Sequence, residues 1–146
     1  MLCLLQRVIQ ASVQVDGETV GAIGAGLLVL VGVEPGDGEA KVTRMAERLL
    51  GYRMFADGQG RMNRSLTDTG GGLLLVSQFT LAADTRSGMR AGFSTAAPPD
   101  QAERAYNRLV EVCRAKHLSG VETGRFGAHM VLGLVNDGPV TFLLRP

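Results

Sequence analysis

Residues 27–33 read LLVLVGV, an unbroken apolar stretch. A strand with one solvated face alternates apolar and polar residues, whereas a strand covered on both faces is apolar throughout. We therefore expect residues 27–33 to form the central strand of a sheet, with other parts of the chain packed over both of its faces.

Other stretches rich in apolar and β-branched residues predict the strands around this centre. Residues 2–15 form the longest stretch and end at Asp16-Gly17, a dipeptide typical of a β-hairpin, so residues 19–23 should return as the partner strand. We expect further strands at residues 73–79, 121–126, 128–135 and 140–144.

Two stretches have the apolar spacing of an amphipathic helix, residues 42–50 and residues 102–113. Asp37 is placed to cap the first helix and Gly51 to end it. Pro98 and Pro99 precede the second helix, and Asp100 with Glu103 resembles a capping box. Strands and helices together predict an α+β class, a single domain over residues 1–146 with about seven or eight strands and two main helices gathered on one side of the strands.

Charge and cysteine content exclude several functional classes. The chain has 15 basic and 14 acidic residues, so no global field attracts polyanions and any nucleic-acid contact must be local. Cys3 and Cys113 are the only cysteines, which excludes a disulfide framework and a Cys/His zinc site, so we expect no metal and no cofactor. No apolar run reaches the roughly 20 residues of a membrane span, and we expect a cytoplasmic protein without membrane contact.

Familiar catalytic constellations are missing. His117 and His129 are the only histidines, and neither accompanies a G-x-S-x-G elbow. The glycines of residues 21–26 precede a strand rather than a phosphate-binding helix, so they form neither a Walker loop nor a dinucleotide fingerprint. An enzyme with this sequence is not built around a conventional side-chain base.

The segment SQFTL, residues 77–81, crowds three hydrogen-bonding side chains at the end of an apolar strand. Strand ends that open into long loops often carry binding sites. The alternative is that Ser77 and Thr80 satisfy backbone groups at the strand end. Both interpretations remain open at this point.

The segment NDGPVT, residues 136–141, predicts a turn that joins the last two strands. Proline has no N–H and glycine has no side chain, so a rigid Gly138-Pro139 turn would also present bare carbonyl oxygens to the ammonium group of a ligand. Two long polar connections, residues 56–72 and 82–99, carry the arginine pairs Arg61/Arg64 and Arg86/Arg90, and function is favoured over disorder for both.

These segments together resemble one family, the D-aminoacyl-tRNA deacylases, over nearly the whole chain. SQFTL and the Gly-Pro segment about 60 residues later form a specific combination. The matching stretches are Gln6-Arg7-Val8, residues 24–33 with Gly36-Asp37, Arg61-Met62-Asn63, SQFTL, residues 83–86, 96–99 and 123–128, and NDGPVT.

The resemblance implies an ester hydrolase that removes D-amino acids, and glycine mischarged on tRNA(Ala), from tRNA. It also implies a compact β/β/α layered fold and a homodimer in which a cis Gly-Pro motif of one subunit enters the pocket of the other and rejects L-amino acids. Gly138 and Pro139 would hold the substrate's α-ammonium. Arg7 would help to fix the Gly-Pro turn, and Arg7 and Asn136 would belong with them to the substrate-binding residues. Ser77, Gln78, Phe79 and Thr80 would line the pocket around the ester.

The resemblance implies a mechanism without a side-chain base. Thr80 has no base to activate it as a nucleophile, so backbone N–H groups near Phe79 and Thr80 would polarise the ester carbonyl. The neighbouring 2′-hydroxyl of the tRNA would position or activate the water. Arg86 and Arg90 would meet phosphates of the acceptor stem.

Two other functions fit the residues. The chain could be a non-catalytic dimeric module whose glycine-rich loops bind a small ligand that resembles an amino acid. A general small-molecule esterase is the third reading, and the absence of a Ser/His pair disfavours it.

Overall fold

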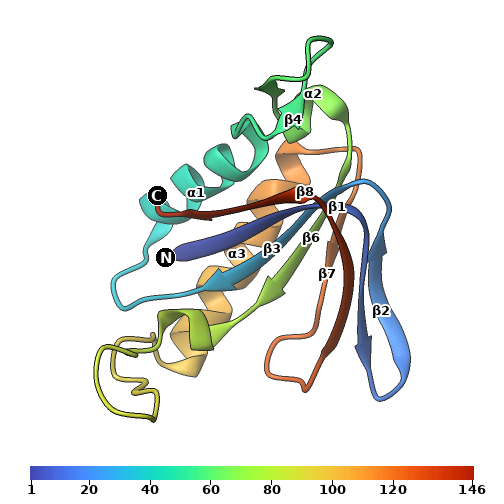
Figure 1. The fold of residues 1–146 in the computed structure, drawn as a ribbon. Helices are drawn as coiled ribbons and strands as arrows, with labels where there is room; N and C mark the ends of the chain where they lie inside the picture. Colours follow the sequence, from blue (N-terminus) through green and yellow to red (C-terminus); the bar gives the residue numbers. More distant parts are fainter.

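The computed structural model describes residues 1–146, and its central strand is the one that the apolar stretch predicts. Strand β3 (Gly26–Gly32) lies between β1 (Leu2–Val15), to which it is antiparallel, and β6 (Gly72–Ser77), to which it is parallel. All residues of β3 except Leu30 are buried. The prediction of a doubly covered strand is confirmed (Figure 1).

Strand β1 connects two parts of the sheet. Its first half pairs with β3, its second half pairs with β2 (Glu18–Ile23), and β8 (Val131–Leu144) runs along its opposite edge. With β7 (Val121–Thr123) beside β6, the sheet curls into a nearly closed barrel. A small cluster that includes Val13, Leu28 and Leu74 fills its interior.

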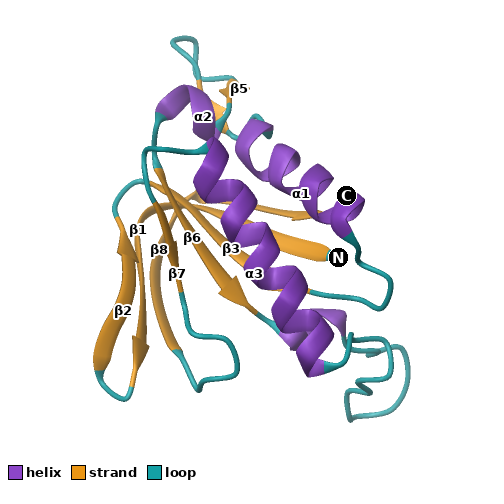
Figure 2. Cartoon of the chain, turned by 180° about the vertical axis from the view of Figure 1, so that it is seen from behind, coloured by secondary structure: helices purple, strands orange, loops and turns teal.

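Helices α1 (Glu39–Gly51) and α3 (Pro99–Lys116) pack side by side on one face of the sheet, where the helical spacing places them (Figure 2). Their buried residues join those of β1, β3 and β6 in the main core of 25 buried residues. The α+β class with helices gathered on one side is confirmed. No helix is long and apolar enough to cross a membrane.

Both predicted helix caps are wrong. Asp37 does not cap α1, which begins after Gly38 without a side-chain cap. The buried Asp37 carboxylate instead pairs with the amino group of Met1 and accepts the N–H of Glu34 at 2.7 Å. Asp100 makes no capping bond, because Pro99 already occupies the first helical position with a preset backbone.

The polar connection over residues 56–72 is more ordered than the sequence suggests. Strands β4 (Phe55–Ala56) and β5 (Met62–Arg64) form a hairpin, and the short helix α2 (Leu66–Thr69) follows. Asp57 closes the hairpin loop by accepting the N–H groups of Gln59 and Arg61. Ser65 and Asp68 form a capping box at α2. Local side-chain bonds to the backbone thus build structure without any apolar pattern.

Three strands differ from their predicted bounds. Strand β6 ends at Ser77, and Phe79–Ala82 form a 3₁₀ turn, η1. Strand β7 ends at Thr123 rather than at residue 126. The two strands predicted at residues 128–135 and 140–144 are one strand, β8, because both halves pair with β1.

Candidate functional site

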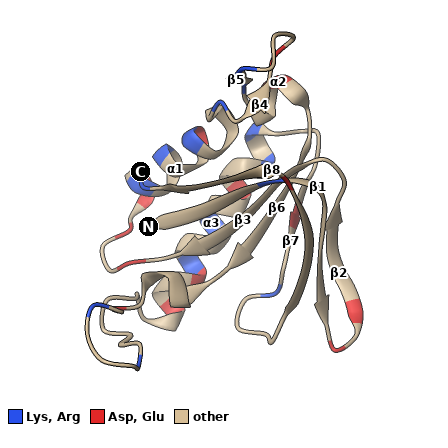
Figure 3. Ribbon diagram, viewed as in Figure 1, with Lys and Arg blue, Asp and Glu red and all other residues tan.

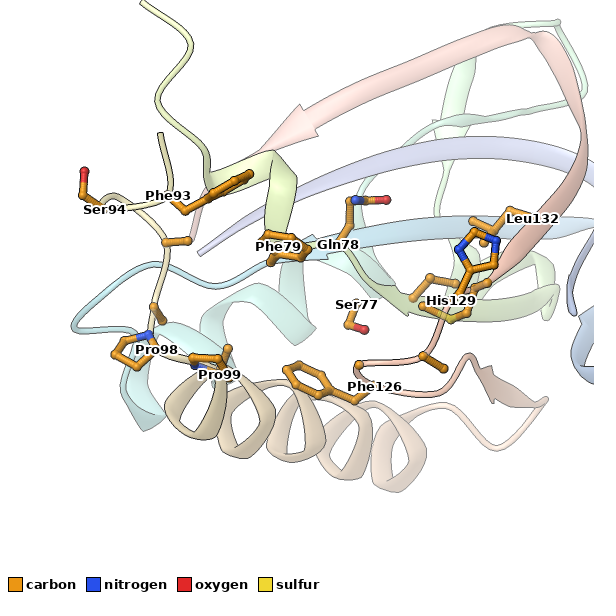
Figure 4. Close-up of a pocket in the computed structure, with 17 residues that line it drawn as sticks. Ser77, Gln78, Phe79, Phe93, Ser94, Pro98, Pro99, Phe126, His129 and Leu132 are labelled. Atoms are coloured by element: carbon orange, nitrogen blue, oxygen red, sulfur yellow. The ribbon is translucent and has the colours of Figure 1, made fainter. Parts of the chain in front are cut away.

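A cavity of about 740 Å³ opens at the carboxyl end of β6 (Figure 4). Ser77 at the end of β6, Gln78 after it and Phe79 at the start of η1 lie in its wall, so part of SQFTL borders a cavity at a strand end. The start of α3 supplies Pro98 and Pro99. The remaining wall comes from the connection between β7 and β8, including Phe126, His129 and Met130.

The hydrogen bonds of SQFTL tie the turn to the sheet. The N–H of Gln78 donates to the carbonyl of Val31 at 2.7 Å, and the N–H of Leu81 donates to the carbonyl of Gln78. The Gln78 side-chain amide donates to the Thr80 hydroxyl at 2.5 Å, and Thr80 itself is exposed beside the cavity rather than part of its wall. The first N–H groups of a helix have no partner within it, which leaves those of Phe79 and Thr80 without acceptors in η1.

Aromatic rings border the cavity on opposite sides. Phe79 and Phe93 are 59% and 49% exposed, and their ring centroids are 5.1 Å apart. Phe126 lies across from them in Figure 4 and packs on Tyr106, whose hydroxyl donates to the carbonyl of Leu75 at 2.8 Å. Exposed rings at a cavity mouth offer flat surfaces for a planar ligand.

His129 is the only titratable side chain in the cavity wall, and no carboxylate, amine, thiol or guanidinium accompanies it. The sequence placed it on a strand, but it precedes β8 in an irregular segment. His117 is buried at the end of α3, where Nε2 lies 2.7 Å from the carbonyl oxygen of Gly71, so its role is structural. The chain has no cluster of three or more metal-ligating side chains.

The Gly-Pro segment is a bulge within β8 rather than a turn between strands. Val8 pairs with Asn136 and Gln6 pairs with Thr141, so four residues of β8, 137–140, lie opposite the single residue Arg7. The Gly138–Pro139 peptide is cis. The extra residues must leave the ladder, and all but Val140 are exposed.

Asn136 and Arg7 hold this bulge from two sides. The Asn136 side-chain oxygen accepts the N–H of Val140 at 2.9 Å, and its amide donates to the Thr141 hydroxyl at 3.2 Å. Arg7 Nε donates to the carbonyl of Asp137 at 3.1 Å and also pairs with the Asp137 carboxylate at 3.3 Å.

A side chain has no room at Gly138. A Cβ there would lie 2.7 Å from a methyl carbon of Val140 and 3.1 Å from Arg7 Nη2, and the backbone has a φ of +129°, which L side chains rarely adopt. Glycine is therefore required for this backbone to approach its neighbours.

The two predicted residue groups do not meet within one chain. Gly138, Pro139, Arg7 and Asn136 form the bulge, and none of them lines the cavity that Ser77, Gln78 and Phe79 border. Strands β1 and β8 also carry five exposed apolar side chains, which we call the β8 face: Ile9, Val131, Leu134, Val135 and Leu143.

The predicted RNA-contact arginines lie in a third place, the exposed connection after η1. Asp84 and Gly92 close this loop by a pair of backbone bonds. Arg86 donates two hydrogen bonds to the Asp84 carboxylate, at 2.7 and 2.8 Å, and these bonds hold the pKa of that carboxyl well below its usual range. Arg90 is exposed and makes no ion pair.

Comparison with known proteins assigns the fold and the sequence to one group. A family model described as D-Tyr-tRNA(Tyr) deacylase matches residues 4–145. A protein of Stenotrophomonas maltophilia (strain K279a) named D-aminoacyl-tRNA deacylase is 76% identical over 146 residues, all of both chains. One of the same name from Xanthomonas oryzae pv. oryzae (strain MAFF 311018) is 73% identical over the same span.

Two solved structures share the fold of this chain. One titled c-Myc DNA unwinding element binding protein superimposes with a TM-score of 0.95 at 38% identity, over 100% of this chain and 99% of that one. Another, titled as a probable eukaryotic D-amino acid tRNA deacylase, has a TM-score of 0.84 at 18% identity, over 98% and 97%, and shares the fold.

The class that fold and sequence define is thus a compact α+β hydrolase scaffold with its cavity at a strand end. The chain belongs to the D-Tyr-tRNA(Tyr) deacylase family, which confirms the resemblance carried by SQFTL and the Gly-Pro segment.

Proposed function

We propose that this protein hydrolyses the ester bond of D-aminoacyl-tRNA and releases the free D-amino acid and tRNA. The observation that carries the proposal combines two features of the chain. One is a cavity with His129 as its only titratable side chain, and the other is the backbone at Gly138 and Pro139, which we call the corner and which has no room for a side chain at Gly138. The names of the relatives that are more than 70% identical support the same reaction. An aminoacyl-tRNA substrate places the activity in the cytoplasm, as a quality-control step of translation.

The complete site requires a second copy of the chain. Gly138 and Pro139 are exposed and lie outside the cavity of their own chain, so they can act on a substrate only in another cavity. The β8 face beside them is apolar and uncovered, as expected for a surface that pairs with its copy. We propose a homodimer in which each protomer inserts its bulge into the cavity of its partner.

Chirality is then selected by shape. The carbonyl oxygens of Gly138 and Pro139 hold the substrate's α-ammonium, and the backbone of the corner occupies the space that an L side chain needs. A D side chain points away from the corner toward solvent, so D-amino acids of different sizes are accepted. Glycine has no side chain to reject, which extends the reaction to glycyl-tRNA mischarged on tRNA(Ala).

The chemistry uses backbone groups and the tRNA rather than His129, which is the one titratable side chain in the cavity wall. The N–H groups of Phe79 and Thr80 polarise the ester carbonyl and stabilise the oxyanion. The 2′-hydroxyl of the terminal ribose positions a water molecule, whose oxygen attacks the carbonyl carbon. The bond between this carbon and the ribose 3′-oxygen breaks, and the 3′-oxygen takes up a proton from the water.

The test compares D-Tyr-tRNA and L-Tyr-tRNA as substrates of the purified protein. We expect selective loss of the D-ester, and Gly138→Ala should lower kcat/KM for it about 100-fold or more by displacing the corner. Gly51→Ala is the matched control, because a Cβ at Gly51 has no neighbour within 4 Å.

Two results would contradict the proposal. If the parent protein hydrolyses neither ester, it is a binding module rather than an enzyme. If Gly138→Ala remains a folded dimer by light scattering and deacylates D-Tyr-tRNA like the parent, the corner does not select the substrate.

A further inference from the structure

Arg7 links the bulge to the base of the β4–β5 hairpin by hydrogen bonds. The Arg7 side chain is only 15% exposed, and while Nε holds the Asp137 carbonyl, Nη1 donates to the carbonyl of Met54 at 2.9 Å. Met54 is fully buried and directly precedes β4. If the bulge binds to another molecule, the base of the hairpin therefore comes to lie beside that molecule as well.

Three arginines of this hairpin are free of carboxylates. Arg53, Arg61 and Arg64, which we call the hairpin patch, are exposed and make no ion pair. Four other arginines of the chain also lack an ion pair, but no other segment of a dozen residues contains three of them. Figure 3 shows basic positions at this end of the molecule beside α2.

The acidic residues nearby are used for other bonds. Both carboxylate oxygens of Asp57 accept hydrogen bonds, from two N–H groups of its own loop and from the Asn63 amide. The N–H of Ser65 donates to the Asp68 carboxylate and is the main cause of its lowered pKa, to which the nearby charges of Arg64 and Arg53 add. Arg64 donates one hydrogen bond to the carbonyl of Asp68 at 2.9 Å, and no carboxylate pairs with any of the three guanidinium groups, so they can still bind an anion from outside.

We propose that the hairpin patch binds phosphates of the tRNA acceptor end whose ester lies in the partner's cavity. This inference rests on the proposed function, because only insertion of the bulge into the partner's cavity brings the hairpin of the same chain to that cavity's mouth. Planar guanidinium groups suit phosphate oxygens. One protomer then supplies the cavity, and the other supplies both the corner at Gly138 and the arginines that bind the RNA phosphates.

The first experiment distinguishes binding of the RNA phosphates from recognition of the ester. The variant R53Q/R61Q/R64Q is assayed on D-Tyr-tRNA and on adenosine that carries D-Tyr on its 3′-oxygen. We expect kcat/KM for the tRNA to fall about tenfold or more, and its salt-dependence slope to fall by about 2, because phosphate contacts release counterions. The value for the adenosine ester should equal that of the parent.

The controls use exposed arginines that neither line the cavity nor contact the bulge. R44Q and R104Q remove exposed arginines on the outer surfaces of α1 and α3, and both should behave as the parent. Parental kcat/KM of the triple variant on the tRNA would overturn the inference while leaving the deacylase proposal intact. If the parent protein hydrolyses neither D-Tyr-tRNA nor the adenosine ester, the proposed function itself is refuted.

The second experiment assigns the patch to a protomer. Mixed dimers are made in which one chain carries Gly138→Ala, so that only the bulge of the other chain works. In one dimer the Gly138→Ala chain also carries the triple substitution, so the chain with the working bulge keeps an intact hairpin patch. Its kcat/KM on the tRNA per active cavity should match that of a dimer of one Gly138→Ala chain and one parent chain. If the triple substitution is on the chain with Gly138, kcat/KM should fall. The reverse pattern would show that the patch serves the cavity of its own chain.

Discussion

Arg7 and Asp137 are 130 positions apart in the sequence, yet Arg7 Nε donates a hydrogen bond to the backbone carbonyl of Asp137 at 3.1 Å. The contact joins the first strand to the bulge of the last one. Because the same guanidinium also reaches Met54, the corner at Gly138 is positioned by two distant segments as well as by Asn136 of its own strand.

Arg7→Lys should loosen this corner. An ammonium group cannot satisfy the Asp137 and Met54 carbonyls in the planar geometry of a guanidinium, and the stability loss should be about 1–3 kcal/mol. We expect a lower kcat/KM for D-Tyr-tRNA together with increased hydrolysis of L-Tyr-tRNA. Urea unfolding and paired D/L assays measure both effects. A variant with parental D/L selectivity would mean that Arg7 does not position the corner.

Thr80→Ala distinguishes a nucleophilic hydroxyl from backbone catalysis. The Thr80 hydroxyl is exposed and accepts a bond from Gln78, whose amide can bind water in its absence. We therefore expect single-turnover deacylation of D-Tyr-tRNA to stay within about threefold of the parent, with stability changed by less than about 0.5 kcal/mol. A loss of about 1,000-fold or more would instead identify a nucleophile.

Phe79→Ala and Phe93→Ala should weaken binding rather than chemistry. The two rings contact each other at the cavity mouth, and stacking of a base on an aromatic ring contributes about 1–3 kcal/mol. We expect KM for D-Tyr-tRNA to rise about tenfold with kcat nearly unchanged. Leu118→Ala is the control, since Leu118 is 92% exposed and lies beyond α3. Unchanged KM in both variants would remove the rings from the binding surface.

Alkaline pH should destabilise the fold through its buried thiols. Burial raises the pKa of the Cys113 thiol from 9.0 to about 12, and it also raises that of Cys3. The folded state therefore holds the proton more tightly than the unfolded state, so the stability contributed by the thiol is complete below pH 9 and declines toward pH 12.

The free energy of unfolding in urea at about pH 8 and about pH 10.5 tests this prediction, with a maximum slope of about 1.4 kcal/mol per pH unit for one group. Cys113→Ala should show a shallower decline than the parent, whatever its stability at neutral pH. Equal slopes would show that Cys113 does not contribute.

The parts of the fold that were predictable are those with a strong periodic pattern. The apolar run at residues 27–33 and the helical spacing at residues 42–50 and 102–113 correspond to β3, α1 and α3. The hairpin and α2 were missed because Asp57, Ser65 and Asp68 build them by polar bonds to the backbone, which leave no hydrophobic signal.

The site was predictable only in part, for a related reason. SQFTL marks a strand end, and its polar residues are visible in the sequence. The opposite wall, with Phe126 and His129, comes from a segment about 50 residues later and meets SQFTL only through the parallel pairing of β6 and β7. The bulge was read as a turn because pairing of both halves of β8 with β1 depends on tertiary structure.

The ladder between β1 and β8 resumes beyond the bulge in a shifted register, with Thr141 opposite Gln6. Pairing of β1 with β8 on both sides of the bulge closes the barrel, so residues 137–140 lie outside the ladder that holds the scaffold together. New stereochemical preferences could therefore be engineered or evolved there without redesigning the scaffold, provided that position 138 stays glycine and the backbone bonds to Arg7 and Asn136 remain.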